Sequence, residues 1–113
     1  MATKTREELV NEALKNLQAV GAGQEPADED YDEVDSKVET LGDQLSADEI
    51  CDVSDWDEIP GEWFDALAEL LANNCASKFG VQFSADKKEF FEKMLRRATA
   101  SRASLEVLKT EYF

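Results

Sequence analysis

The sequence of 113 residues contains no histidine, and this absence removes whole classes of chemistry. Histidine is the most common general base and the most common metal ligand in proteins. Without it, neither a Ser-His-Asp triad nor a Cys-His pair can activate a nucleophile. The glycines at 21 and 23 do not form a phosphate-binding loop, because they follow a predicted helix and do not continue as GxGxxG. We therefore expect a protein that is not an enzyme and that binds no cofactor and no metal.

Cysteines and long apolar runs are also scarce. Cys51 and Cys75 form no CxxC pair, so the sequence gives no support for a zinc site or a dithiol redox centre. We expect Cys75 to be a small core residue in a reducing compartment. No apolar run approaches the roughly 20 residues of a membrane-spanning helix, and the first residues show no apolar signal-peptide region. The sequence therefore predicts neither a membrane span nor secretion.

Negative charge is abundant and unevenly distributed. The net charge is −14, and fifteen carboxylates lie between Glu25 and Glu58 against a single basic residue, Lys37. Residues 84–113 instead contain seven basic and five acidic residues. Such a molecule repels nucleic-acid phosphates unless its basic end is presented alone.

Apolar spacing predicts four helices and hence an all-α fold. The first helix is expected over residues 6–20, with Thr5 and Glu8 as a capping box and the glycines at 21 and 23 as its end. The second follows Pro26. Its apolar residues, from Ala27 to Leu45, are spaced 4-3-4-3-4, which predicts one continuous helix with a narrow apolar face.

The third helix begins at Pro60 or Gly61 and is the most apolar, so it should form the centre of the core. Gly80 is its expected cap, and Val81 and Phe83 are expected to continue the buried path. The fourth helix begins after an N-cap at Ser84 and runs to about residue 107, with apolar positions including Phe90, Phe91, Met94 and Leu95. The small residues at 99–104 predict that this helix leaves the core there. We expect a four-helix bundle-like domain over residues 1–104 and an extended docking tail over residues 105–113.

A long acidic loop is expected between the second and third helices, over residues 46–58. Its apolar residues are predicted to anchor it onto the core, and they are Ile50, Val53, Trp56 and Ile59. A loop of this length is either an interaction surface or a segment wrapped on its own domain, and the sequence leaves both interpretations open.

Four carboxylates of the acidic segment match part of the spacing of a calcium-binding loop. Asp28, Asp30, Asp32 and Glu39 fall at positions 1, 3, 5 and 12 of an EF-hand count, but position 6, which requires glycine, is Glu33. We therefore expect a solvated acidic face of a helix.

Opposite charges on the second and fourth helices suggest a contact between copies. The basic residues of the fourth helix either form a solvated face with pairs such as Glu89–Lys93 and Glu92–Arg96, or meet the acidic second helix of a neighbouring copy. Head-to-tail contacts of the second kind close into rings. The candidate surface comprises Asp28, Asp32, Asp35, Glu39, Lys93, Arg96, Arg97 and Arg102.

Two segments carry a resemblance to a known family. One is ELVNEALKNLQAVGAGQEP, residues 8–26, and the other runs from Asp57-Glu-Ile-Pro60 through Ala66-Leu67 and Leu70-Leu71 to Lys78-Phe79-Gly80-Val81. Their order and spacing resemble the head-to-tail adaptor proteins of tailed phages, also called head-completion or packaged-DNA-stabilisation proteins. The sequence departs from the family's plainer Ala/Leu pattern at Asn73-Asn74-Cys75.

The resemblance implies a structural protein that binds the portal as a twelvefold ring of copies, extends the DNA channel and offers a platform to tail or stopper proteins. Packaged DNA would pass through without specific binding, and the protein would reside in the virion connector after assembly in the host cytoplasm. The expected portal-docking residues are Leu105, Leu108, Lys109, Tyr112 and Phe113. The alternative is an acidic inhibitor that mimics DNA and occupies a nucleic-acid-binding host protein.

Overall fold

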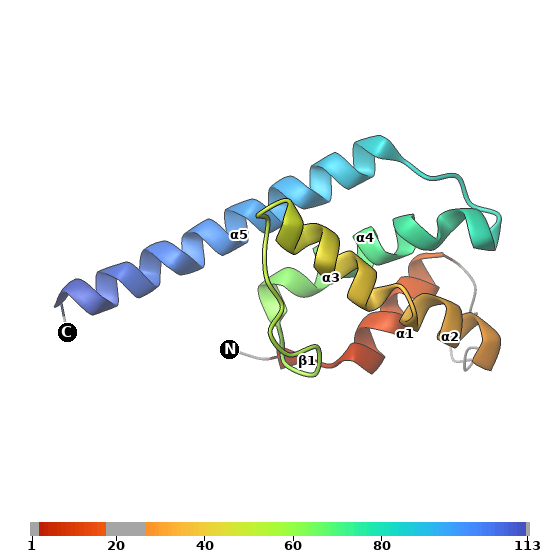
Figure 1. Cartoon of the computed structure of the whole chain (residues 1–113), viewed down its shortest axis with the longest axis horizontal. Coiled ribbons are helices and arrows are strands. Elements are labelled where there is room, and N and C mark those ends of the chain that lie inside the picture. The colour runs from red at the N-terminus through yellow and green to blue at the C-terminus, as the bar shows by residue number, and fades with distance from the viewer. Residues whose placement is uncertain (1–2, 18–26, 113) are drawn as a thin grey trace.

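The computed structural model describes residues 3–17 and 27–112, and for residues 101–112 it describes the backbone alone. Helices dominate, so the predicted all-α class is confirmed. The elements are, in chain order, β1 (Thr3–Lys4), α1 (Arg6–Asn16), α2 (Asp28–Asp35), α3 (Val38–Ala47), β2 (Ile59–Pro60), α4 (Gly61–Cys75), a 3-10 segment (Ala76–Phe79) and α5 (Ala85–Tyr112). Helix α4 lies among α1, α3 and α5, and α5 projects beyond the other elements (Figure 1).

Helix α1 begins at the capping box that the sequence predicts. The Glu8 N–H donates to the Thr5 hydroxyl over 3.2 Å, and the Thr5 N–H donates to the Glu8 carboxylate over 3.2 Å. The backbone hydrogen bond also lowers the pKa of Glu8. The last helical residue is Asn16, and the expected end at 20 and the glycines at 21 and 23 lie outside the described residues.

The predicted single second helix is wrong, because the structure divides it into α2 and α3. The Lys37 N–H bonds the Val34 carbonyl, three residues back, and the Ser36 hydroxyl donates to the Glu33 carbonyl over 2.7 Å. These bonds interrupt the four-residue hydrogen-bond ladder at 36–37 while the backbone stays in the right-handed helical region. The apolar positions Val34 and Val38 are both buried on either side of the bend. The spacing therefore identified the buried face and not the bend.

The acidic loop wraps on its own domain. The predicted start at residue 46 is wrong, because α3 continues to Ala47 and the loop starts at Asp48. There the Ile50 N–H bonds the Leu45 carbonyl and the Glu49 N–H bonds the Ser46 carbonyl, a Schellman ending for α3. Glu49 takes the left-handed conformation with φ 57°. The structure places all four predicted anchors on the core. Ile50 and Ile59 are buried, and Val53 and Trp56 are partly buried.

The ring of Trp56 packs directly on Gly42 of α3. A Cβ atom at residue 42 would lie 2.7 Å from a carbon of the indole ring. Only glycine admits this approach, so Gly42 and Trp56 together fix the loop against α3.

A short β-ladder, which the sequence did not predict, joins the N-terminal segment to the start of α4. Thr3 pairs with Pro60 and Lys4 with Ile59 in antiparallel register. This ladder closes the end of the domain where α1 and α4 begin (Figure 1).

Helix α4 is the centre of the core, as predicted. It begins directly after Pro60, and Leu67 and Leu71 are fully buried. The helix ends at Cys75 and continues as the 3-10 segment to Gly80, which caps it in the left-handed conformation with φ 72°. The prediction of Gly80 as the cap is therefore confirmed.

Asn73 joins α4 to the start of α5. Its side-chain N–H donates to the Ser84 carbonyl over 2.9 Å, and its amide oxygen accepts the Ser84 N–H over 2.9 Å. Asn73 is the one polar residue among the buried residues that the structure describes. Its departure from an Ala/Leu pattern is thus explained by two hydrogen bonds that a buried alanine could not make.

Helix α5 begins at the predicted cap, where the Ser84 hydroxyl accepts the Lys87 N–H over 3.2 Å. Leu95 is fully buried and Ala98 packs partly buried against the core, after which the helix leaves the domain as predicted. The predicted end at about 107 is wrong, because α5 continues to Tyr112. No glycine or proline lies in its 28 residues, so nothing in the sequence interrupts the helix.

Candidate functional site

The acidic residues of α2 and α3 divide into two groups. Arg6 of α1 donates from Nε to the Asp35 carboxylate over 2.7 Å and from Nη2 to the Asp35 carbonyl over 3.0 Å, and it reaches Glu39 over 3.4 Å. The hydrogen bond to Asp35 raises the pKa of Arg6. Arg6 therefore holds α1 against the α2–α3 bend, and these two acids already have a partner within the chain.

Asp28 and Asp32 are exposed on α2, one helical turn apart. Their neighbour Glu33 pairs with Lys78 over 3.0 Å. Residues 28–35 are helical, so these acids lie on a helix face as predicted and not on a calcium-binding loop. In the described part of the chain no group of three or more acidic or cysteine side chains is arranged to hold a metal ion.

Most basic residues of α5 that the structure describes are exposed, and Lys88 is partly buried. The predicted Glu89–Lys93 pair is confirmed, with 3.1 Å between Lys93 Nζ and the carboxylate. The predicted Glu92–Arg96 pair is wrong. Glu92 instead pairs with Lys88 over 2.7 Å, which raises the pKa of Lys88.

Arg96 and Arg97 complete the described basic surface. Arg96 Nη2 lies 3.4 Å from the Asp48 carbonyl, so it leans toward the end of α3, and Arg97 is exposed. The side chain of Arg102 lies outside the described residues. The acidic residues that were predicted to meet a neighbouring copy thus lie on α2 and α3, and the basic ones lie on α5.

Four large apolar side chains near α5 are exposed, although the sequence placed two on a buried path and two at the apolar positions of the helix. Val81 and Phe83 are 44% and 47% exposed, which contradicts the buried path predicted after Gly80. Phe90 and Met94 are 59% and 40% exposed, although helical spacing assigned them to the apolar positions of the helix. They are exposed because α5 contacts the domain on one side only, where Leu95 is buried.

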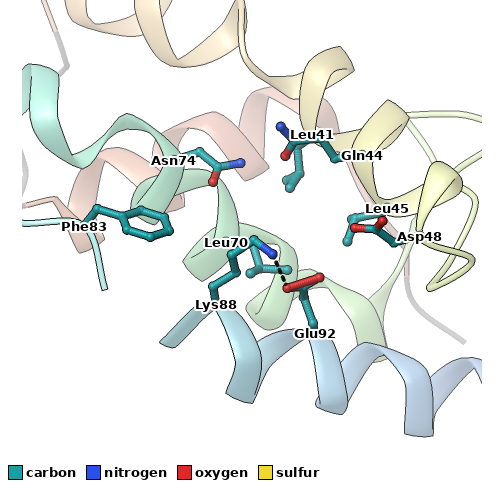
Figure 2. Close-up of a pocket in the computed structure, with 9 residues that line it drawn as sticks. All are labelled: Leu41, Gln44, Leu45, Asp48, Leu70, Asn74, Phe83, Lys88 and Glu92. Carbon is teal, nitrogen blue, oxygen red and sulfur yellow. Dashed lines mark hydrogen bonds and ion pairs between the residues drawn. The ribbon is translucent and has the colours of Figure 1, made fainter. Parts of the chain in front are cut away.

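A groove opens between α3, α4 and the first turns of α5 (Figure 2). We call it the α3–α5 groove. Its volume is about 400 Å³, and Figure 2 shows Phe83 at one end, Asp48 at the other and the Lys88–Glu92 ion pair along one wall. Apolar and polar side chains both line it, and they are Leu41, Gln44, Leu45, Asp48, Leu70, Asn74, Phe83, Lys88 and Glu92. Sequence reasoning did not find this groove, because it forms between elements that are distant in the chain.

The two cysteines are buried, and their thiols are not activated as nucleophiles. Burial raises the pKa of both Cys51 and Cys75 to about 11, so their thiols stay protonated near neutral pH. Both are free and belong to the hydrophobic core cluster. The expectation of Cys75 as a small core residue is confirmed.

The predicted portal-docking residues lie on the projecting part of α5. The backbone of Leu105, Leu108, Lys109 and Tyr112 is helical, their side chains lie outside the described residues, and so does all of Phe113. Within the described ranges, none of the helices combines the length and apolar character that crossing a membrane requires.

Comparison of the chain with models of protein families, with curated proteins and with solved structures gave no match.

Proposed function

We propose that the chain is a structural head-to-tail adaptor of a tailed phage, which binds the portal ring and extends the DNA channel. The observation that carries the proposal is the projection of α5. This helix of 28 residues gives the molecule extents of 50 × 27 × 21 Å, and its C-terminal part lies outside the small domain formed by the other elements. A helix without neighbours in its own chain is a means of reaching a partner.

The distribution of charge supports a structural role in a DNA channel. Exposed carboxylates such as Asp28 and Asp32 cover α2, and the basic residues lie on α5. In the proposed assembly, an acidic surface along the channel would repel the phosphates and allow DNA to slide without binding. The same ring would present a platform to tail or stopper proteins and help to retain packaged DNA in the virion.

Docking on the portal is assigned to residues 105–113, which include Leu105, Leu108 and the aromatic residues at 112 and 113. Aromatic and leucine side chains are typical anchors when a helix binds in an apolar groove. The resemblance of the sequence to the adaptor family supports the same placement.

Cosedimentation with isolated portal rings from the same source, followed by electron microscopy of the pellet, tests the proposal. A second ring stacked on one end of the portal is the expected result. An intact portal that leaves the protein in the supernatant would refute it. A charge-reversal control, Asp28→Lys, separates docking through α5 from nonspecific electrostatic attraction, because docking through α5 should survive the change.

A second candidate function is inhibition of a nucleic-acid-binding protein by mimicry of DNA. The exposed acids of α2 and the acidic loop favour it, because closely spaced carboxylates imitate a phosphate backbone. It predicts competition with DNA in a gel-shift assay that weakens steeply as salt increases. Absence of competition at low salt would reject this candidate.

A further inference from the structure

The exposed apolar residues of α5 form a compact projection. Phe90 and Met94 are one helical turn apart and therefore lie on one side of the helix. The Phe90 ring packs edge-on against Phe91, with 5.1 Å between centroids, which fixes its position on the helix. Lys87 and Lys93 lie three residues before and after Phe90, and Arg97 lies one turn further. The acids on this side of the helix are Asp86 and Glu89, and Glu89 is paired with Lys93.

The α3–α5 groove lies on the other side of the same helix. Its α5 wall is formed by Lys88 and Glu92. Phe90 stands midway between them, and residues two apart in a helix point in nearly opposite directions, about 200° apart. A single molecule therefore presents an apolar projection on one side of α5 and an open, partly apolar groove on the other.

The two surfaces also differ in charge. Helix α3, which forms the opposite wall of the groove, contains Glu39 and Asp43 and no basic residue. Among the residues that line the groove, Asp48 and Glu92 face a single base, Lys88. On the far side of α3 a second cavity of about 260 Å³ is lined by Glu39, Asp43 and Asp52 beside Trp56. Acids thus outnumber bases around the groove, and bases outnumber acids around the projection.

We propose that the α3–α5 groove receives the Phe90–Met94 projection of a second copy of this chain. The apolar side chains enter beside Leu45, Leu70 and Phe83, while Lys87 and Arg97 approach Asp48 at the rim of the groove. The contact is head-to-tail, because projection and groove are different surfaces of each molecule, and repetition of such a contact closes a ring or extends a filament. The inference rests on the proposed function and deepens it by naming the surface between neighbouring copies.

Cysteine cross-linking between two variants tests the pairing directly. Phe90→Cys and Phe83→Cys replace exposed side chains, and the natural cysteines are buried, so a short bismaleimide should react at the new thiols alone. Mixing the two variants should give a cross-linked heterodimer, while each variant by itself should give little product. Cross-linking of Phe90→Cys with itself would show a symmetric contact and overturn the proposal.

Sedimentation over a concentration series gives the second readout. Phe90→Glu and Phe83→Glu should each weaken self-association by about tenfold or more, while Val81→Glu, an exposed apolar residue that does not line the groove, should leave it unchanged. Circular dichroism confirms that each variant is folded. A chain that stays monomeric at every concentration, and whose Phe83→Cys and Phe90→Cys variants do not cross-link to each other, would overturn this inference. Because portal rings are absent from both experiments, that outcome is distinguishable from failure of the chain to cosediment with the portal.

Discussion

Helices α4 and α5 both carry regular apolar residues, but their surroundings differ. Helix α4 contacts α1, α2, α3 and α5, and its residues are buried except along a narrow stripe that includes Glu62 and Asp65. Helix α5 is almost twice as long and rests on the domain through one side of its first half, where Leu95 is its one fully buried residue among those described. Apolar spacing therefore predicts a helix, but the number of neighbouring elements decides which apolar residues are buried.

The difference has a consequence for function. Packing between elements holds α4 in place, whereas the second half of α5 depends on its own helix propensity and on any partner that covers it. The domain should therefore tolerate changes in the projecting part of α5 that it would not tolerate in α4.

Truncation of a buried side chain in α4 should have the largest effect on stability. Leu71→Ala is expected to lower the free energy of unfolding by about 2–5 kcal/mol, because it removes a fully buried side chain and leaves a cavity. The matched change on α5, Met94→Ala, should cost less than about 1 kcal/mol, since Met94 is 40% exposed. Urea unfolding measures both. Equal losses would contradict the contrast between the two helices.

Asn73 should account for the next largest effect, because it ties α4 to α5. Asn73→Ala leaves the Ser84 N–H without an acceptor and the Ser84 carbonyl with the Lys88 N–H alone, and it is expected to cost about 1–3 kcal/mol. Asn74→Ala, the adjacent change of the same chemistry, is the control and should be nearly neutral, because Asn74 is only partly buried in the groove wall. Thermal unfolding of the two variants compares them.

Alkaline pH should destabilise the core through its thiols. Burial raises the pKa of Cys51 and Cys75 to about 11 in the folded protein, from about 9 for a thiol in an unfolded chain. Between these values the unfolded state releases protons that the folded state retains, so the free energy of unfolding should decrease as pH rises from about 9 to about 11.

The Cys51→Ala/Cys75→Ala double variant should show a shallower decrease over the same pH range, and urea unfolding at several pH values measures it. At pH 8 a thiol reagent should label neither cysteine in the folded protein and both in urea. Rapid labelling without urea would show that the cysteines are not enclosed by the α4-centred core.

The smallest expected effects concern two residues in the left-handed conformation. Gly80→Ala, at the joint between α4 and α5, should cost about 1 kcal/mol through backbone strain alone, because nothing lies within 4 Å of the added carbon. Glu49→Gly, at the end of α3, should stabilise the fold by a similar amount by relieving the same strain. Thermal unfolding should therefore give shifts of opposite sign, and shifts of the same sign would refute this account.

Much of the fold could be predicted because local signals fix it. Each of these signals acts through hydrogen bonds or dihedral angles within a few residues and marks a helix boundary in the structure. They are the Thr5–Glu8 capping box, Pro60, Gly80 and Ser84. The features that were missed depend on context. The bend at 36–37 leaves the apolar spacing intact, and Glu49 occupies a position where glycine or asparagine would have been the signal.

The candidate site was harder to predict than the fold. The groove joins α3, α4 and α5, whose order along the chain does not reveal their packing. The exposure of Phe83 and Phe90 could not be read from spacing, because the same pattern fits a helix covered on two sides. Asp35 and Glu39 were assigned to a partner surface, and their contact with Arg6 spans about thirty residues of sequence.

Deletion of residues 105–113 tests the central claim most directly, because it removes the assigned docking segment and leaves the domain. Full-length and shortened chains would be compared by thermal unfolding and by cosedimentation with portal rings. We predict an unchanged unfolding temperature, since the last residue of α5 seen in contact with the core cluster is Ala98, together with loss of portal association. A shortened chain that binds the portal as well as the full-length chain, or that no longer folds, would contradict the account.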